Sequence, residues 1–177
     1  MPRVVIVGTG GTMSHAGRHP LDLVEYADGA RIVQASELVA KIPQVSTVAD
    51  VVTAEFSAVA SVDLGPKEWL ALNDLIHELV SEHAPVDGIV VVHGTATLEE
   101  TAYFLNLTLK VDQTLVVVGA QRPLDVVSTD ADINLINAVR VAADPAARNL
   151  GVLVVLNDEI QAAREVSKTS THRLETF

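Results

Sequence analysis

The sequence predicts an α/β fold in which helices cover both faces of a mainly parallel sheet. Short apolar runs rich in Val and Ile recur along the chain, as expected for strands buried on both faces. Segments with helical spacing and capping residues alternate with these runs, an order that favours right-handed crossovers. The composition agrees: 49% of the residues are hydrophobic but only 3% are aromatic, so Val, Ala and Leu must fill the interior. At 177 residues, one ordinary domain is expected.

Five apolar runs are expected to be strands, at residues 4–7, 48–59, 88–92, 115–118 and 151–156. Four helices are expected, at residues 37–42, from 66 through 79, from 98 onward and at 131–142. Ser36, Thr97 and Asp130 stand at the predicted N-caps, and Glu100 would complete a capping box with Thr97. Pro66 is suited to the first turn of the second helix.

The charge and composition exclude several classes of function. The formal net charge of −11 argues against nucleic acid or an anionic membrane surface as a partner. The absence of cysteine excludes disulfides and thiol catalysis. The six histidines show no ligand pair at helical spacing, so we expect neither a metal nor a cofactor. The first residues lead straight into a strand and no run approaches membrane-spanning length, which favours a cytoplasmic enzyme unless an exported form has lost its leader.

Two polar turns follow predicted buried strands and are candidates for a ligand site. HGTA at residues 93–96 lies between a strand and a helix, where open α/β sheets place their ligands. The glycines of GTGGT at residues 8–12 allow the backbone to approach a ligand or a neighbouring strand closely. A dinucleotide fingerprint would need a third glycine at Met13 and a helix directly afterwards. Residues 14–20 have the composition of a loop instead, so nucleotide binding is disfavoured.

These turns carry a resemblance to a known family. GIVVVHGTAT followed by EETAYFLNLT resembles the second signature of the bacterial-type L-asparaginases, usually written HGTDT. GTGGT resembles the first signature, with Met13 where isoleucine or valine is usual, and GAQRP at residues 119–123 is similar to the family's G-A-x-R-P. The resemblance spans the whole chain. It implies the N-terminal asparaginase domain, a mainly parallel Rossmann-like sheet with helices on both faces.

The resemblance implies four catalytic residues. Thr12 takes the place of the nucleophile, and Tyr26 that of a tyrosine on a flap that ends in a turn at Gly29. Thr95 and Lys168 would form a second hydroxyl–amine pair, in which burial would lower the pKa of the lysine. Each has an ordinary interpretation as well: turn threonines that satisfy loop backbone groups, a tyrosine packed on the surface, and a solvated lysine.

The same resemblance implies a substrate-binding set. Ser61 would contact the substrate carboxylate, although it could equally be a helix cap, and backbone N–H groups around Gly11 and Thr95 could serve an oxyanion. The aspartate of HGTDT accepts a hydrogen bond from the substrate ammonium and lies beside the lysine. Ala96 can do neither, and Val62 replaces a residue that is often polar. Three explanations stay open: an engineered variant of low activity, a natural member acting on a different amide, and a degenerate domain that only binds.

The function implied is an L-asparaginase-type amidohydrolase. It would hydrolyse the side-chain amide of asparagine, or glutamine, to the acid and ammonia through an ester on a threonine, impaired by Ala96. The alternative is a non-catalytic small-molecule binding or regulatory domain that uses the same crevice.

The family also implies partners and a second domain. Its members continue into a smaller α/β domain, so we expect residues 1–177 to be the N-terminal domain and that second domain to be absent from this chain. Further site residues come from the second domain of a neighbouring subunit, which puts the activity of this chain alone in doubt. A homo-oligomer is implied, since the full-length family forms dimers or tetramers, with a small-molecule amide as substrate.

Overall fold

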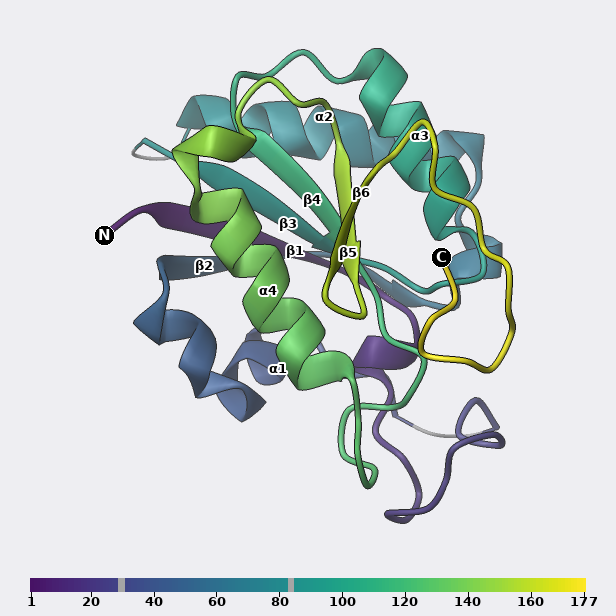
Figure 1. Cartoon of the computed structure of the whole chain (residues 1–177). Helices are drawn as coiled ribbons and strands as arrows, with labels where there is room; N and C mark the ends of the chain where they lie inside the picture. The colour runs from purple at the N-terminus through teal and green to yellow at the C-terminus, as the bar shows by residue number, and fades with distance from the viewer. Residues whose placement is uncertain (29–30, 83–84) are drawn as a thin grey trace.

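The computed structural model describes residues 1–28, 31–82 and 85–177. Within them lies one six-stranded sheet in the order β2-β1-β3-β4-β5-β6 (Figure 1). The strands are β1 (Arg3–Gly10), β2 (Asp50–Val59), β3 (Gly88–Val92), β4 (Thr114–Val118), β5 (Leu153–Leu156) and β6 (Glu159–Ala162). β1 to β5 are parallel, and β6 runs antiparallel to β5. The prediction of an α/β fold with a mainly parallel sheet is confirmed.

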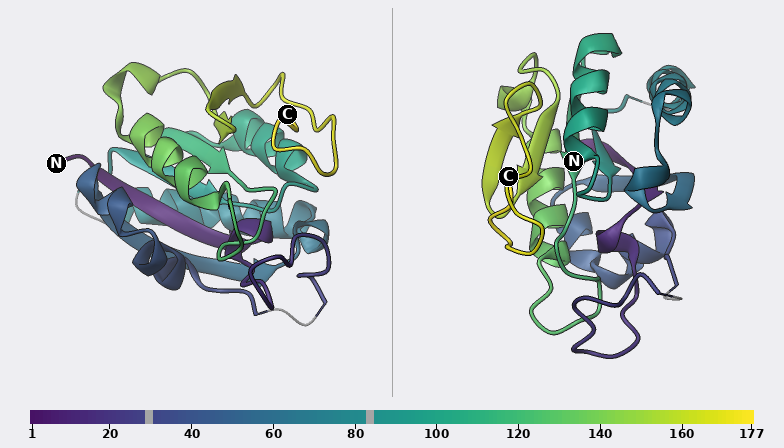
Figure 2. Two further views of the ribbon diagram at one scale, coloured as in Figure 1. Left: turned by 60° about the horizontal axis from the view of Figure 1, so that its bottom comes forward. Right: turned by 90° about the vertical axis from the view of Figure 1, so that its right-hand side faces the viewer.

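Four α-helices in the described residues cover both faces of this sheet: α1 (Ala35–Lys41), α2 (Pro66–Glu82), α3 (Leu98–Thr108) and α4 (Ala131–Ala143). α1 and α4 pack on one face, while α2 and α3 pack on the other (Figures 1 and 2). In this part of the chain no helix combines the length and the apolar character needed to cross a membrane.

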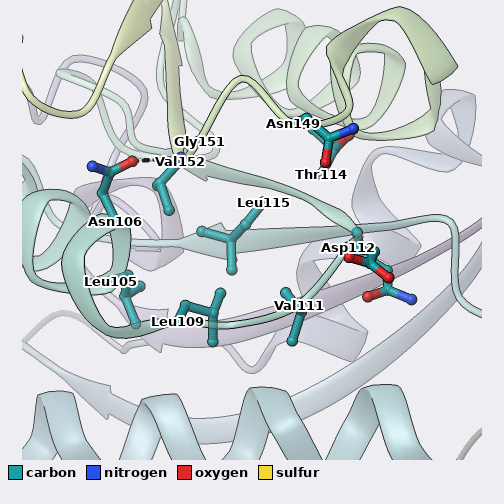
Figure 3. Close-up of a pocket in the computed structure, with 11 residues that line it drawn as sticks. Leu105, Asn106, Leu109, Val111, Asp112, Thr114, Leu115, Asn149, Gly151 and Val152 are labelled. Atoms are coloured by element: carbon teal, nitrogen blue, oxygen red, sulfur yellow. Dashed lines mark hydrogen bonds between the residues drawn. The ribbon is translucent and has the colours of Figure 1, made fainter.

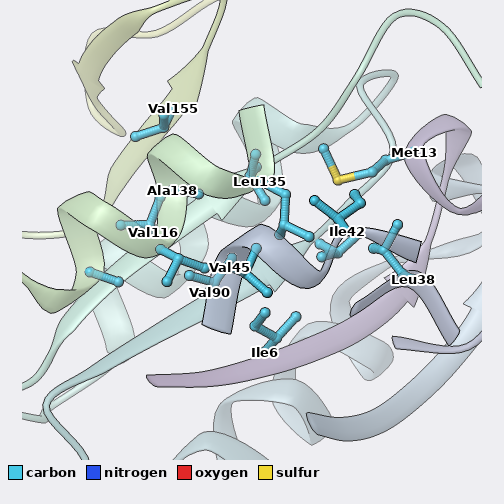
Figure 4. Packing of buried hydrophobic residues seen from close by; sticks show 14 of the residues in the cluster. Ile6, Met13, Leu38, Ile42, Val45, Val90, Val116, Leu135, Ala138 and Val155 are labelled. Atoms are coloured by element: carbon cyan, nitrogen blue, oxygen red, sulfur yellow. The ribbon is translucent and has the colours of Figure 1, made fainter. Parts of the chain in front are cut away.

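The alternation of side chains along each strand divides the core into two halves. Ile6, Val90 and Val116 point to the α1 and α4 face, where they pack with Leu38 and Leu135 (Figure 4). The residues directly before or after them on the strands belong to the cluster under α2 and α3. Because both faces are covered, β3 and β4 are buried along their whole length, which explains why they are wholly apolar in sequence.

The strand order places a topological switch at β1. The chain leaves β1 through α1 to reach β2 on one side, and then returns through α2 to β3 on the other side. At such a point the two crossovers diverge, and ligands of open α/β sheets bind in the crevice at the carboxyl ends of the strands. The candidate turns at residues 8–12 and 93–96 both lie there.

The helix caps differ from the prediction. Thr97 and Asp130 do stand at the N-caps of α3 and α4, but neither side chain caps its helix. The Thr97 hydroxyl donates to the carbonyl of Ser61 at 2.7 Å, and the Asp130 carboxylate accepts from the N–H groups of Gln121 and Arg122 at 2.9 Å. These polar side chains therefore connect neighbouring turns at the carboxyl edge.

One further expectation on secondary structure was wrong, and one strand was missed. Ser36 lies inside α1, whose N-cap is Gln34, and the first N–H groups of that helix are bound by Glu55 of β2. The strand β6 was not predicted, because EIQA is short, polar and exposed or half-buried. Gly29, at the end of the predicted turn after Tyr26, lies outside the described residues.

Candidate functional site

A cavity of about 360 Å³ opens at the carboxyl ends of β1 and β3. All the residues that the sequence singled out line it: Thr12, Tyr26, Thr95 and Lys168 from the catalytic set, and Gly11, Ser61 and Ala96 from the binding set. They come from five separate segments of the chain. The fold thus brings the predicted residues together, while their chemical roles stay predictions.

Contact between two turns builds the floor of the cavity. Gly11 has a φ of 81°, in the left-handed region that favours glycine, and a Cβ on it would lie 2.2 Å from the Cα of Gly94. A Cβ on Gly94 would in turn lie 2.7 Å from the Ser61 hydroxyl oxygen. No side chain larger than hydrogen fits at either position. Gly11 and Gly94 are therefore required for the close contact between the two turns.

One hydroxyl pair lies at the end of β1. The hydroxyls of Thr12 and Tyr26 share a hydrogen bond of 2.8 Å. The ring of His15 lies edge-on to the Tyr26 ring, with centroids 5.4 Å apart, and its Nδ1 donates to the carbonyl of Gly11 at 2.8 Å. His15 thereby supports the tyrosine from behind. The loop that carries Tyr26 is also joined to the loop at residues 121–130, where Val127 donates its N–H to the carbonyl of Pro20 (Figure 1).

A second pair lies at the end of β3. The Nζ of Lys168 donates to the Thr95 hydroxyl at 2.7 Å. Burial lowers the pKa of Lys168 below its ordinary value of 10.5, and the negative charge of Glu99 opposes this shift. Glu99 also accepts hydrogen bonds from the backbone N–H of Lys168 and from the Ser167 hydroxyl, so it holds the tail segment against the start of α3.

His93 stabilises the turn from within the core. Its ring is completely buried, and burial lowers its pKa to about 4, so the ring is neutral at physiological pH. Its Nδ1 lies 2.8 Å from the Gly94 carbonyl, which can only accept, and therefore carries the proton. Its Nε2 then accepts from the Thr101 hydroxyl at 2.9 Å. Through these two hydrogen bonds His93 braces the turn.

The binding residues occupy two different environments. Ser61 is buried and its hydroxyl faces the Gly94 turn, whereas Val62 is 68% exposed. Ala96 is also exposed, at the rim of the cavity. A carboxylate in place of Ala96 would therefore be partly hydrated in this chain.

Sequence reasoning missed three lining residues with polar side chains: His15, Gln121 and Thr171. His15 carried no signal beyond its place three positions after Thr12. Gln121 had a usable one, since it follows β4 just as Thr12 follows β1, and carboxyl ends of parallel strands meet at one edge. Its amide nitrogen Nε2 is buried and has no hydrogen-bond partner within the described residues.

Another cavity lies at the opposite edge of the sheet, where β4 and β5 begin (Figure 3). Its volume is about 70 Å³, and Asn106 crosses it to accept from the N–H of Val152 at 3.0 Å. It contains no pairing of a nucleophile with a base. The described residues contain no group of three or more His, Asp or Glu side chains that could hold a metal ion.

Comparison with known proteins assigns the chain to a family. The family model "Asparaginase, N-terminal" matches residues 3–177. L-asparaginase 2 of Bacillus subtilis (strain 168) is 44% identical over all of this chain and 46% of its own length. A glutaminase-asparaginase of Pseudomonas fluorescens biotype A is 43% identical over all of this chain and 48% of its own length.

A solved structure agrees with these relatives. The crystal structure of a probable cytoplasmic L-asparaginase from Campylobacter jejuni superposes with a TM-score of 0.91 at 36% identity. The superposition covers 99% of this chain and 52% of the other. The chain thus spans about half the length of these relatives. From the matched model, the identities and the shared fold, the chain belongs to the asparaginase family, of which it corresponds to the N-terminal region.

Proposed function

We propose that this site serves an L-asparaginase-type amidohydrolase with Thr12 as its nucleophile. The substrate would be the side-chain amide of asparagine, with glutamine as the second candidate. The observation that carries the proposal is the presence of two polar pairs in one cavity: Thr12 with Tyr26 at 2.8 Å, and Thr95 with Lys168 at 2.7 Å. A threonine hydroxyl needs such partners because it is a weak nucleophile on its own.

The reaction would proceed in two steps. The oxygen of the Thr12 hydroxyl bonds to the amide carbon, and the proton of that hydroxyl passes to the polar pairs. The amide C–N bond then breaks, and the same proton joins the departing amino group to give ammonia. Water next adds to the ester, the ester C–O bond breaks, and the acid departs as the Thr12 hydroxyl is restored. No other reactant is needed, so one amide and one water give one acid and one ammonia.

Lys168 is suited to the role of proton acceptor through Thr95. Burial lowers the pKa of the lysine, which increases the fraction of neutral amine available at a given pH. In the described residues, the N–H groups of Gly94, Thr95 and Ala96 donate to no protein acceptor, and α3 begins directly after them. They could stabilise the oxyanion that forms on the amide oxygen.

The proposal includes weak activity on asparagine itself. Ala96 is exposed and offers no acceptor for an α-ammonium group. This same observation favours the alternative, a non-catalytic domain that binds a small molecule in the cavity. The two differ in one respect: the alternative does not require the Thr12 hydroxyl to be consumed and restored.

Assembly and compartment belong to the proposal too. The chain spans about half of its relatives, so activity, substrate and a homo-oligomeric state are proposed for the longer protein. The Campylobacter jejuni neighbour is described as cytoplasmic, and a Haemophilus influenzae relative with 38% identity as periplasmic. We propose the cytoplasm, by analogy with the Campylobacter jejuni neighbour.

Ammonia release from L-asparagine and L-glutamine tests the proposal. Thr12→Val replaces the hydroxyl by a methyl group and should abolish product while the fold is retained, as judged by circular dichroism. Thr47→Val is a matched control, because that exposed hydroxyl bonds only to the Gln44 carbonyl far from the cavity. Equal rates for Thr12→Val and the unchanged protein would show that the nucleophile is elsewhere.

A further inference from the structure

His15 contacts both sides of the Thr12–Tyr26 pair. Its Nδ1 donates to the carbonyl of Gly11, the residue directly before Thr12, at 2.8 Å. The same imidazole lies edge-on to the Tyr26 ring, with the centroids 5.4 Å apart and the planes at 69°. One side chain therefore touches the turn that carries the hydroxyl of Thr12 and the ring that carries its partner hydroxyl.

The His15 ring is itself held in place by the surrounding chain. The residue is 7% exposed, and its carbonyl accepts from the N–H of Leu124 at 2.9 Å. Its N–H donates to the carbonyl of Thr12 at 3.0 Å, and its backbone forms an antiparallel bridge with Ile32. These contacts join three segments of this chain, so the position of the imidazole does not depend on a further domain or on a neighbouring subunit.

Tyr26 depends more than His15 on a single neighbour. It lies on the loop that leaves the chain after His15 and returns at Arg31, whose carbonyl accepts from the N–H of Ala16 at 2.9 Å. Within the described residues, its side chain makes one hydrogen bond, to Thr12, and one aromatic contact, to His15. Because aromatic rings prefer this edge-on arrangement, the imidazole restricts the plane in which the phenol ring lies.

From these contacts we propose that His15 is a positioning residue, which directs the Tyr26 hydroxyl onto the Thr12 oxygen. The Nδ1 donor is present in the neutral Nδ1–H tautomer and in the charged ring alike, so this role requires no proton transfer by His15. A displacement of about 1 Å among reacting groups can cost about a hundredfold in rate. The inference rests on the proposed function, in which Thr12 is the nucleophile, and adds to it a residue that does not itself touch the reacting atoms.

Nuclear magnetic resonance on this chain tests the placement of Tyr26 without any turnover. The methyl group of Thr12 should show a nuclear Overhauser effect to the ring protons of Tyr26, since their hydroxyls are 2.8 Å apart. His15→Asn keeps a donor near the Nδ1 position but removes the ring, and it should lose most of this signal. His15→Phe keeps a ring but removes the donor, and it should retain the signal.

His77→Asn is the matched control for His15→Asn. The Nδ1 of His77 also lies at hydrogen-bond distance, 2.9 Å, from the carbonyl four positions earlier, that of Asn73, but on α2 away from the cavity. This variant should leave the signal between Thr12 and Tyr26 unchanged. Full intensity in His15→Asn, with the fold retained by circular dichroism, would overturn the proposal.

Ammonia release from L-asparagine by the longer protein tests whether this placement serves the reaction. His15→Asn should lower kcat about a hundredfold with a smaller change in KM, and His15→Phe should restore most of the loss. In a Tyr26→Phe background the same His15→Asn change should cost little more, because the hydroxyl that His15 positions is already gone.

A general structural role for His15 would instead multiply the two losses, and that result would contradict the proposal. If the unchanged protein releases no ammonia while the resonance signal depends on His15 as expected, the proposed function fails and the placement of Tyr26 by His15 stands.

Discussion

Lys168 and Thr95 are separated by 73 positions in the sequence, yet the lysine Nζ lies 2.7 Å from the threonine hydroxyl. The contact joins the tail after β6 to the turn after β3. It is supported on the far side by Glu99, which holds the backbone of the same lysine. Two hydrogen bonds thus hold the tail at the sheet edge, one to Thr95 in the turn before α3 and one to Glu99 in the first turn of α3. The position of the lysine amine is therefore set by this part of the chain and not by the tail alone.

A dependence of activity on Lys168 follows from its environment. Because burial lowers the pKa of Lys168 from 10.5, a role as base predicts that kcat/KM rises with pH and levels off below pH 10.5. Lys168→Met should remove most of the turnover and leave the residual rate flat over that range. A rise of the same size in Lys168→Met would show that another group is titrating.

Lys168 should also affect stability with a definite sign. The folded state disfavours the charged lysine, so the unfolded chain binds more protons between the lowered pKa and 10.5, and stability rises with pH across that window. Below the window the desolvation penalty is fully present. Urea unfolding of Lys168→Met should therefore show a smaller rise in stability over this pH range than the unchanged protein. Parallel curves for the two proteins would contradict the assignment.

His93 should make the fold sensitive to acid. Its ring is neutral in the folded state down to about pH 4, whereas in the unfolded chain it takes a proton near pH 6.5. Stability should consequently fall as the pH drops from 6.5 to about 4, by about 3 kcal/mol at most from this residue. His93→Gln should lose that part of the pH dependence, since the carboxylates that titrate in the same range are common to both proteins. Identical pH slopes in urea titrations of the two would exclude the effect.

The start of α1 provides a test of the capping found in the structure. Glu55 accepts from the N–H groups of Ala35 and Ser36 at 2.9 and 3.0 Å, whereas the Ser36 side chain makes no cap bond. Glu55→Ala should lower the free energy of unfolding by about 1 kcal/mol, the usual cost of a lost N-cap. Ser36→Ala is the matched control and should change it by less than about 0.5 kcal/mol. A larger loss of stability in Ser36→Ala than in Glu55→Ala would show that Ser36 caps the helix.

Those capping residues show where sequence reasoning reaches its limit. The strand at residues 88–92 was predicted with both ends correct, because a run buried on two faces has to be apolar throughout. Local capping rules found the N-cap positions of α3 and α4 but not the partners, since Thr97 bonds to Ser61, 36 positions away, and Asp130 bonds to the turn that precedes its own helix. Glu55 caps a helix 20 residues earlier, and no local pattern contains that information.

The residues of the site also divide into those that a general rule places and those that it does not. Thr12 and Thr95 could be placed from the rule that parallel strands end at one edge, and the same rule would have found Gln121. Tyr26 and Lys168 could be placed only through the family resemblance, because a tyrosine in a long loop and a lysine in a tail have no periodic context. The exposure of Ala96 could not be inferred from the sequence, because no local pattern reports it.

The last prediction concerns that alanine. Ala96→Asp would add the one carboxylate that the lining lacks, close to the Thr95–Lys168 pair. Since the position is exposed in this chain, the new charge would be partly hydrated, and its attraction for a ligand ammonium should be about 0.2–1 kcal/mol. That corresponds to a gain of roughly 1.4- to fivefold in aspartate affinity, with the affinity for succinate lowered by repulsion. The melting temperature should change little, because a surface substitution of this kind shifts stability by about 0.5 kcal/mol or less.

Val62→Asp is the matched control for Ala96→Asp. It adds the same charge to the same cavity from an exposed position on another segment, so it reports any general effect of negative charge there. Calorimetry with aspartate and succinate should show a larger change of preference for Ala96→Asp than for Val62→Asp, because position 96 directly follows Thr95, which binds Lys168. In the longer protein the effect on asparagine turnover should be greater if the cavity is closed, since leaving a buried charge without its partner costs about 2–5 kcal/mol. If Ala96→Asp leaves both the preference and the turnover unchanged in the two proteins, then position 96 does not recognise the ammonium group, and the site distinguishes its ligands through other residues.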